Sequence, residues 1–424
     1  MLHITRRQLL ISGAAGSIAG AAMPARAQQP APLQASYSSG AFRELMTQAA
    51  GDFERQPNGT RVAYRAPVVA SLEDHFQNTL RWAVTNDLPD VSFQANNHIQ
   101  LLAERDLTVP LDRFIAAEPA WNELGYAASV REIGRIGEQV HGLPFQMSVP
   151  VNMFNLELVR RAGGDPDDLP RSWDALIDLA RRIRAADPGA IGACFDYNAT
   201  GSWTFQALIA SQGGRMMSPD ERSIAFDGPE GLFALDLMRR FGETGGVDMS
   251  QQQMFQAFGA GQVGILAATN NMIGQFEQQA AGRFRIGAVA WPLLSPAGKL
   301  PAGGRTAVMF TKDPARQAVA WSFIKFMTGP AVQTMVATML GAVPANEIAL
   351  RRPELLGRFY QEHPAHRAGV ERLAALTAWY NFPGPNSIRI SQVIRDHLRR
   401  VVMLQAPPAQ VMAEMARDVG ALLA

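Results

Sequence analysis

Short apolar strands alternate with amphipathic helices from Leu33 onward, and this alternation restricts the fold more than any other feature of the chain. Residues 33–37, 61–65 and 89–93 have the pattern of strands. Residues 41–55 and 71–84, which lie between them, carry apolar side chains at helical spacing, and the second helix has a serine cap. Successive units of this kind build a mostly parallel sheet with helices on both faces. An α/β fold is therefore predicted.

The length of the chain requires more than one core. Its 424 residues exceed the about 250–300 residues at which a single hydrophobic core stops growing, so two domains are expected. Residues 139–155 are predicted to be extended. Residues 348–424 are predicted to be helical, to contain no strand and to cover a sheet face. The remaining predictions are strands over 190–195, 263–268, 284–289 and 306–311, and helices over 156–162, 173–186 with Ser172 as cap, 203–212, 230–241, 251–258, 272–279 and 314–327, the last closed by Gly329-Pro330.

The first 27 residues have the pattern of an export signal. Residues 5–10 contain two adjacent arginines and resemble the twin-arginine motif. An apolar run follows over residues 11–23, and residues 24–27 end in a small-x-small cleavage site. A general secretory signal that carries two arginines is the alternative. Either route leads to a periplasmic protein, and no later segment is apolar enough to suggest a membrane span.

Composition excludes several classes of function. The net charge of +1 gives no global field that would attract nucleic acid or an anionic membrane. Cys194 is the only cysteine, so neither an internal disulfide nor a multi-cysteine zinc or iron–sulfur site is expected. We predict that Cys194 is a small buried residue on the strand over residues 190–195.

Two local patterns could be mistaken for functional motifs. Residues 259–264 match Gly-x-Gly-x-x-Gly, but a dinucleotide site needs a strand before the glycines and a helix after them. The predicted order here is the reverse, which indicates a tight helix-to-strand corner. His363 and His366 are three residues apart around Pro364, and no cluster of carboxylates accompanies them. A solvated loop is therefore expected, and neither a metal site nor a cofactor is predicted.

Several longer motifs follow one another in a characteristic order. Residues 142–155 form an extended segment before a short helix, and residues 169–176 open a long helix with Pro-x-Ser-Trp-Asp. The further motifs are a helix-to-strand corner at 254–264, a glycine pair at 302–305 followed by the helix at 315–327, and a Gly-x-x-Pro link at 341–344. The ordered set resembles the periplasmic binding proteins of ABC importers, in particular the large carbohydrate-binding family that includes maltose- and glycerol-3-phosphate-binding proteins.

The resemblance implies a fold of two α/β lobes joined by a hinge, with the ligand in the cleft between them. Lobe one would comprise residues 33–148 and 305–343, and lobe two residues 149–304 and 344–424. The implied function is that of a periplasmic solute-binding component, which closes on a small molecule and presents it to the membrane permease of an ABC importer. We expect a monomer that performs no chemical reaction.

Candidate ligand-binding residues follow from the chemistry of a polyhydroxylated solute, which needs flat aromatic faces and hydrogen-bonding side chains. They are sought where strands end and at the crossings between lobes. The alternatives remain open: helix capping for the first three candidates, core packing for Trp203, Gln146 and Met147, and a surface salt bridge for Arg305. The candidates are Asn96, Asn97, His98, Gln146, Met147, Trp203, Asn270, Asn271, Gly304, Arg305, Trp379 and Tyr380.

The chain departs from the phosphate-binding relatives at several positions. It has no arginine near residues 383–385, and Asn96 stands where those relatives carry an acidic residue. Both departures favour a mono- or disaccharide or a polyol. One alternative is glycerol 3-phosphate, a glycerophosphodiester or another anionic solute. The other alternative, from a different class, is an exported twin-arginine enzyme.

Overall fold

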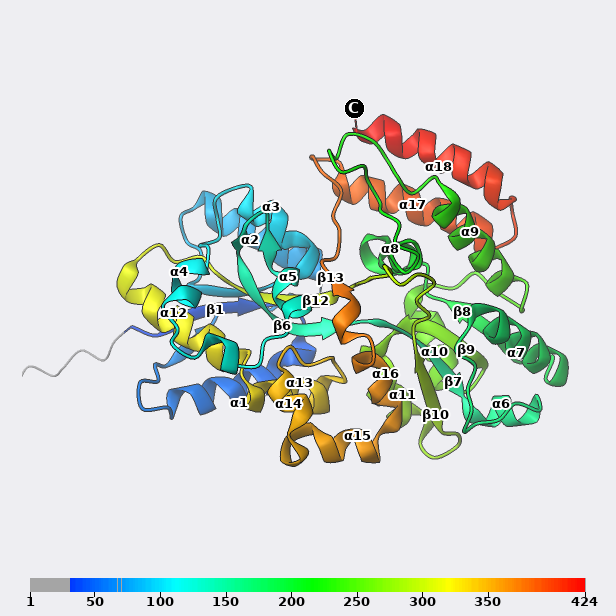
Figure 1. The fold of residues 1–424 in the computed structure, drawn as a ribbon, viewed down its shortest axis with the longest axis horizontal. Coiled ribbons are helices and arrows are strands. Elements are labelled where there is room, and N and C mark those ends of the chain that lie inside the picture. The colour runs from blue at the N-terminus through cyan, green and yellow to red at the C-terminus, as the bar shows by residue number, and fades with distance from the viewer. Residues whose placement is uncertain (1–30, 67, 70, 424) are drawn as a thin grey trace, which may run out of the picture. The chain divides into compact units, whose positions relative to one another are not determined.

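A five-stranded sheet forms the first of two α/β bodies in the computed structural model, which describes residues 31–66, 68–69 and 71–423 (Figure 1). Its strands are, in spatial order, β2 (Val62–Tyr64), β1 (Leu33–Tyr37), β3 (Val91–Ala95), β12 (Gly303–Met309) and β6 (Gly142–Ser148). β1 pairs in parallel with β2 and β3, whereas β12 is antiparallel to both of its neighbours. Four of the five strands therefore run in the same direction, as the prediction of a mostly parallel sheet requires, and β12 is reversed because it enters from the second body without a crossover helix.

Helices pack around this sheet much as the apolar spacing predicts. The hydroxyl of Ser71 accepts a hydrogen bond from the Asp74 amide at 3.0 Å, which confirms the predicted cap. Gly329-Pro330 ends one helix as predicted, but Pro330 also begins the next, because proline fits the first helical position. The α-helices that precede β6, together with the first two that follow β12, are α1 (Arg43–Glu54), α2 (Leu72–Val84), α3 (Ile99–Ala103), α4 (Asp112–Ala116), α5 (Ala128–Ile133), α12 (Pro314–Met327) and α13 (Pro330–Leu340).

A four-stranded sheet forms the second body. Its order is β10 (Ile286–Ala290), β7 (Pro150–Asn155), β9 (Val263–Thr269) and β8 (Ile191–Phe195), and only the pair β8 and β9 is parallel. Cys194 is buried on β8 as predicted, and burial raises the pKa of its thiol to about 12. The helices of this body are α6 (Leu156–Arg161), α7 (Trp173–Ala186), α8 (Trp203–Ala210), α9 (Pro229–Gly242), α10 (Gln251–Gly259) and α11 (Ile273–Ala280). A helix therefore precedes the glycine-rich corner and a strand follows it, which confirms the reversed order.

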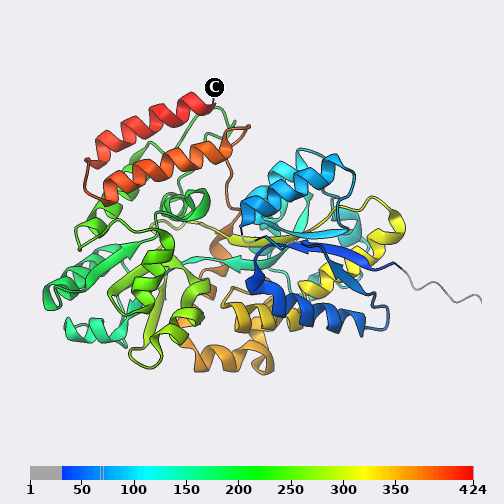
Figure 2. The ribbon, with the colours of Figure 1, turned by 180° about the vertical axis from the view of Figure 1, so that it is seen from behind.

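Residues 348–423 are mostly helical but contain one short strand. β13 (Leu376–Thr377) pairs in parallel with β11 (Leu300–Pro301), so the prediction that this segment has no strand is wrong. Two residues of pairing leave no periodic signal in the sequence. Figures 1 and 2 show α17 packed against α18 and α9. The helices of the segment are α14 (Glu347–Arg351), α15 (Arg358–Glu362), α16 (Arg367–Val370), α17 (Ser387–Val402) and α18 (Pro408–Leu423), and a small hairpin near the first body comprises β4 (Arg135–Ile136) and β5 (Gln139–Val140).

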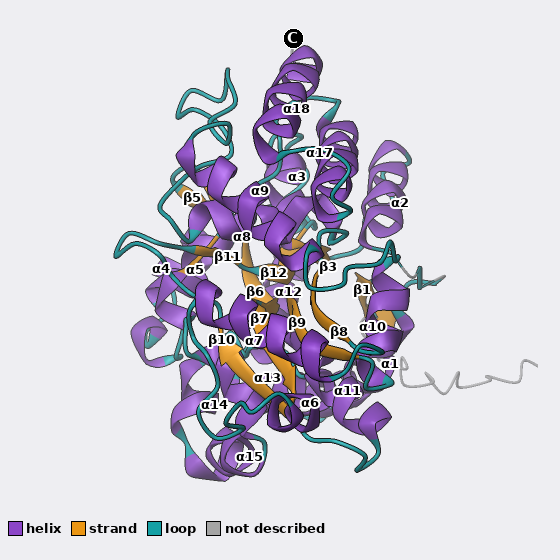
Figure 3. Ribbon diagram, turned by 90° about the vertical axis from the view of Figure 1, so that its right-hand side faces the viewer, coloured by secondary structure: helices purple, strands orange, loops and turns teal. Residues whose placement is uncertain are grey.

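Three segments connect the two bodies. The chain passes from β6 to β7 through Val149 and from β11 to β12 through Ala302. A third segment begins with residues 341–346 after α13 and reaches the second sheet at α16, which packs on β10. The first and third segments lie side by side, because Met147 and Val343 form an antiparallel bridge. Figure 3 shows the strands of both bodies in a view along the longest axis of the molecule.

The export signal predicted for residues 1–27 lies outside the described residues. Within the described part of the chain, no helix has both the length and the apolar character that crossing a membrane requires.

Candidate ligand-binding cleft

A cleft of about 220 Å³ lies between the two bodies, and both contribute to its wall. From the first body come the N-terminus of α2 and the cleft ends of β6 and β12. From the second body come the ends of β8 and β9 and the starts of α8 and α10. The lining residues are Leu72, Gln146, Ser148, Asp196, Ala199, Thr200, Trp203, Gln251, Thr269, Asn271, Gly303, Gly304, Arg305 and Trp379.

Two indole rings form the apolar part of the cleft. The rings of Trp203 and Trp379 are tilted by 55°, with centroids 6.3 Å apart, and they pack with Ala199 in a small separate cluster. Trp203 is anchored because its Nε1 donates a 2.8 Å hydrogen bond to the Pro301 carbonyl. The Nε1 of Trp379 is buried without a partner among the described residues. A fixed aromatic face and a free indole donor both suit a solute that carries C–H surfaces and hydroxyls.

Arg305 brings a positive charge to the cleft from β12. Its Nε donates to the Ser38 hydroxyl at 3.3 Å and one terminal nitrogen donates to Gln146 Oε1 at 3.1 Å. The guanidinium also lies over the ring of Phe42, with its central carbon 4.1 Å from the ring centroid. Burial lowers the pKa of Arg305 to about 10, so the group remains cationic at neutral pH. Among the described residues its side-chain hydrogen-bond partners are both neutral, and the predicted alternative of a surface salt bridge is wrong.

Asp196 brings a carboxylate from the opposite wall, directly after β8. The residue is 1% exposed. Its Oδ2 accepts a 2.7 Å hydrogen bond from Gln251 Nε2, whereas Oδ1 is buried without a partner among the described residues. Burial raises the pKa of Asp196 to about 7, and the amide of Gln251 partly opposes this shift. A buried acceptor that lacks a hydrogen-bond partner on one of its two oxygens is suited to a hydroxyl or amine donor of a ligand.

Gly304 allows β12 to approach β6 closely at the cleft. Its φ is +111°, and a Cβ atom at this position would lie 2.0 Å from the Gln146 carbonyl oxygen. Any larger residue would push the two strands apart. The glycine therefore sets the positions of Arg305 and Gln146, whose side chains are hydrogen-bonded to each other.

The structure brings six of the predicted site residues together in this cleft: Gln146, Trp203, Asn271, Gly304, Arg305 and Trp379. Asn97 and Tyr380 instead line a neighbouring groove of about 730 Å³, which Trp379 also borders. Asn96 lies at this groove as well, but its amide donates to the carbonyls of Ala302 and Gly303, at 2.9 and 3.0 Å. Its side chain therefore holds the start of β12 and caps no helix.

Three predicted site residues lie in the packed interior. The ring of His98 packs against that of Phe76 with centroids 4.5 Å apart and an interplanar angle of 33°, and burial lowers the pKa of His98 to about 4. Met147 is fully buried in the core. Asn270 joins two of the connecting segments: its Oδ1 accepts from the Val149 amide and its Nδ2 donates to the Gly341 carbonyl, both at 2.8 Å.

We expect the substitution Asn270→Ala to lower the free energy of unfolding by about 2 kcal/mol, because it removes two buried hydrogen bonds and leaves the Val149 amide unsatisfied. Chemical denaturation at pH 7.5 measures the change. Thr338→Ala, on the exposed face of α13, is the control and should change stability by less than about 0.5 kcal/mol. Equal stabilities of the two variants would contradict the role of Asn270 as a connector.

Two polar residues that complete the cleft, Asp196 and Gln251, are not among the predicted site residues. Asp196 is the first residue after its strand, so the rule that ligands bind beyond strand ends could have found it. Gln251, by contrast, is at the start of α10, which Ser250 caps, and it reaches Asp196 only through the tertiary fold. No local pattern indicates that contact.

The interpretation of the two neighbouring histidines as a solvated loop is also wrong. His366 is buried, and His363 is only partly exposed. A carboxylate does converge on them, that of Glu277 from α11, which is 86 positions before the first histidine in the sequence and adjacent only in the fold.

The comparison with known protein families agrees with this architecture. Residues 48–368 match the family of bacterial extracellular solute-binding proteins, and the chain belongs to this family. A curated relative is the "Probable amino-acid ABC transporter periplasmic-binding protein" of Sinorhizobium fredii, 24% identical over 80% of this chain and 78% of that protein. Another is the sn-glycerol-3-phosphate-binding periplasmic protein UgpB of Agrobacterium fabrum, 21% identical over 59% of this chain and 58% of the relative.

Solved structures share the fold over nearly the whole chain. UgpB from Mycobacterium tuberculosis, in complex with glycerophosphocholine, aligns with a TM-score of 0.79 and 19% identity over 93% of this chain and 98% of that one. The cyclic α-maltosyl-1,6-maltose binding protein from Arthrobacter globiformis aligns with a TM-score of 0.77 and 19% identity over 93% and 99%. The predicted two-lobed periplasmic-binding-protein fold is confirmed, and the chain is a solute-binding protein of the ABC-transporter type.

Proposed function

We propose that the protein captures a small carbohydrate-like solute, a mono- or disaccharide or a polyol, in the cleft and delivers it to an ABC importer permease. The observation that carries this proposal is the meeting of two indoles with amide, hydroxyl, carboxylate and guanidinium groups from both bodies in one cleft. Aromatic faces with convergent polar groups are the usual means of binding a polyhydroxylated molecule. The cleft volume of about 220 Å³ favours a small solute over a long oligosaccharide.

The binding mechanism that we propose is hinge closure between two lobes. We assign residues 33–148 and 305–343 to lobe one, and residues 149–304 and 344–424 to lobe two. A solute between Arg305 and Asp196 contacts both lobes only when they are closed, so its binding energy favours the closed form. The permease would then recognise the closed form of a monomeric binding protein.

A thermal-shift screen of sugars, polyols and glycerophosphodiesters tests the proposal. A true ligand at 100 times its dissociation constant should stabilise the protein by about 2.7 kcal/mol, and a Trp203→Ala, Trp379→Ala double variant should lose the shift. The absence of a shift with any member of the panel would leave the assigned solute class without support. Recovery of a chemically altered solute after incubation would support an enzyme instead of a binding protein.

An anionic solute is the second candidate, and Arg305 favours it. The guanidinium faces the cleft with only neutral hydrogen-bond partners, so a phosphate or carboxylate could supply the missing counter-charge. The relatives named for glycerol 3-phosphate and the homologous complex with glycerophosphocholine point in the same direction. The inclusion of glycerophosphodiesters in the screen allows the two candidates to be separated.

We further propose that the chain is exported to the periplasm through the twin-arginine signal in residues 5–10. This proposal rests on the adjacent arginines, the apolar run and the cleavage site of the N-terminal sequence. It is supported by the extracellular character of the family to which the chain belongs.

A further inference from the structure

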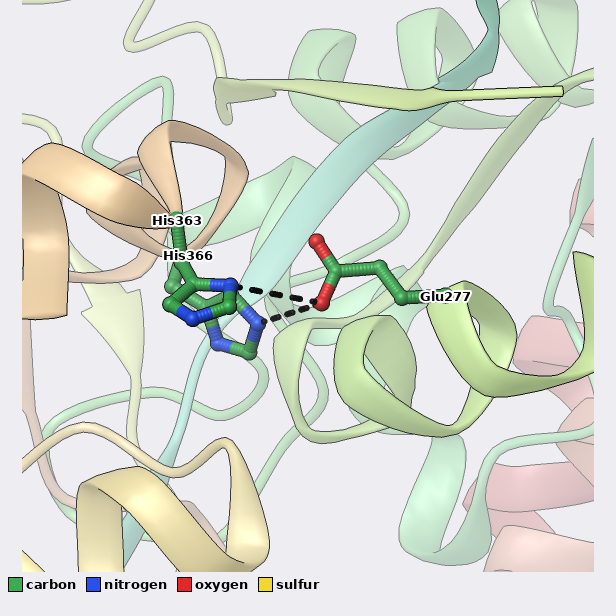
Figure 4. Close-up of side chains that lie close together, drawn as sticks. All are labelled: Glu277, His363 and His366. Carbon is green, nitrogen blue, oxygen red and sulfur yellow. Dashed lines mark hydrogen bonds and ion pairs between the residues drawn. The ribbon is translucent and has the colours of Figure 1, made fainter. Parts of the chain in front are cut away.

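Two imidazole rings and one carboxylate converge on a single point outside the cleft. His366 Nε2 lies 3.3 Å from Glu277 Oε2, and His363 Nδ1 lies 3.9 Å from the same oxygen (Figure 4). One ligand atom from each of the three residues can be chosen so that all lie within 4.8 Å of one another. Ligand atoms around a tetrahedral zinc ion, at about 2.0–2.1 Å from the metal, are about 3.3 Å apart. Small side-chain rotations would therefore bring the three groups to coordination distance.

The local fold holds the two histidines in this arrangement. Residues Pro364–His366 form a 3₁₀ turn in which the His366 amide donates to the His363 carbonyl at 3.1 Å. Side chains three residues apart on such a turn project from the same side. The ring of Phe359 packs against both imidazoles, with centroid distances of 4.9 Å to His363 and 5.2 Å to His366. The sequence His-Pro-Ala-His thus presents two nitrogen ligands together.

The chemistry of the donor set selects a class of metal. Two imidazole nitrogens and one carboxylate oxygen suit zinc and neighbouring transition metals, whereas calcium and magnesium prefer oxygen ligands alone. A hydrogen bond between His366 and Glu277 explains one of the contacts. That hydrogen bond does not account for the position of His363, whose Nδ1 faces the same oxygen at 3.9 Å, which is too far for a hydrogen bond.

We propose that Glu277, His363 and His366 bind a divalent transition metal of the zinc class, with water in the fourth position. His363 and Glu277 are both partly exposed, so solvent can reach that position. The ion would tie α11 of the second body to the segment α14–α16, which packs on α13 through Ala337 and Tyr360. His366 also lies beside the third connecting segment, because a Cβ atom at Gly341 would be 3.5 Å from its Cε1.

The test uses the full chain, purified without a histidine tag and stripped of metal with a chelator. Calorimetric titration with ZnCl₂ should show one tight site per chain, and CoCl₂ should give the visible absorption of four-coordinate cobalt. MgCl₂ should not compete. His363→Ala and Glu277→Gln should each weaken zinc binding more than about 10-fold and should leave the melting temperature of the metal-free protein almost unchanged. These two positions are chosen because the buried His366 is more prone to disturb folding.

His397→Gln is the matched control, since His397 faces Asp418 at 3.0 Å in a histidine–carboxylate pair that has no second imidazole within reach among the described residues. This variant should bind zinc as the unmodified protein does. Equal zinc affinity in the His363→Ala and Glu277→Gln variants would overturn the proposal, because the ion would then bind elsewhere. The absence of zinc binding by the unmodified chain would also overturn it.

Discussion

The substitution Arg305→Ala should abolish the binding of an anionic solute, with a loss of affinity of more than about 100-fold. The guanidinium is the one cation that lines the cleft among the described residues, and its present partners are the neutral Ser38 and Gln146. A neutral sugar would lose only one or two hydrogen bonds to the same group, and we expect about a 10-fold loss. Calorimetric titration of the best ligand from the thermal-shift screen measures the difference.

Two further variants make this experiment decisive. Arg305→Lys retains the positive charge but loses the planar, two-pronged guanidinium. Its affinity for an anion should therefore lie between that of Arg305→Ala and that of the unmodified protein. Arg171→Ala removes an exposed arginine that pairs with Glu371 away from the cleft, and it should leave affinity unchanged. An anionic ligand that binds the Arg305→Ala variant as tightly as the unmodified protein would show that Arg305 is not part of the site.

The substitution Asp196→Asn should have opposite effects on stability and on binding. At pH 8 the buried carboxylate is ionised and only half satisfied, so its neutral isostere should stabilise the empty protein by about 1–3 kcal/mol. The same change weakens the side chain that we propose accepts a hydrogen bond from the solute, so the affinity for the solute should fall about 10–100-fold. A residue with a purely structural role would not combine higher stability with lower affinity.

The pH dependence of stability follows from the raised pKa of Asp196. The folded pKa is about 7 and the unfolded value is about 3.9. The contribution of this group to stability is therefore fully present below pH 3.9, and it is lost as the pH rises through 7. Chemical denaturation at pH 5 and pH 8 should show that Asp196→Asn raises the free energy of unfolding, relative to the unmodified protein, by more at pH 8 than at pH 5. Asp248→Asn, at an exposed carboxylate paired with Arg399, should show no such advantage.

The helices and strands that the sequence predicted well are those that are encoded by residues close to one another in the chain. The helix α7 begins after the predicted Ser172 cap and ends at the predicted Ala186, because a cap and an apolar stripe are both encoded within 15 residues. β1 occupies the predicted residues 33–37 for the same reason. The ordered motifs also led to the two-lobed fold, although no single one of them is specific.

What the sequence could not predict depends on contacts between distant residues. The antiparallel entry of β12 between β3 and β6 joins residues that are more than 150 positions apart, and no periodicity records it. The candidate site shows the same limit. The search for polar and aromatic residues at strand ends and lobe crossings predicted twelve site residues, of which six line the cleft, whereas the partnership of Asp196 with Gln251 exists only in the folded chain.

The central claim is that one small solute is held between the two bodies by groups from both. A crystal structure of the complex with the best ligand of the screen tests it most directly. We predict that the solute lies against Trp203 and Trp379 and accepts a hydrogen bond from Arg305 while it donates one to Asp196. A solute bound outside this cleft, or in contact with only one of the two bodies, would contradict the account.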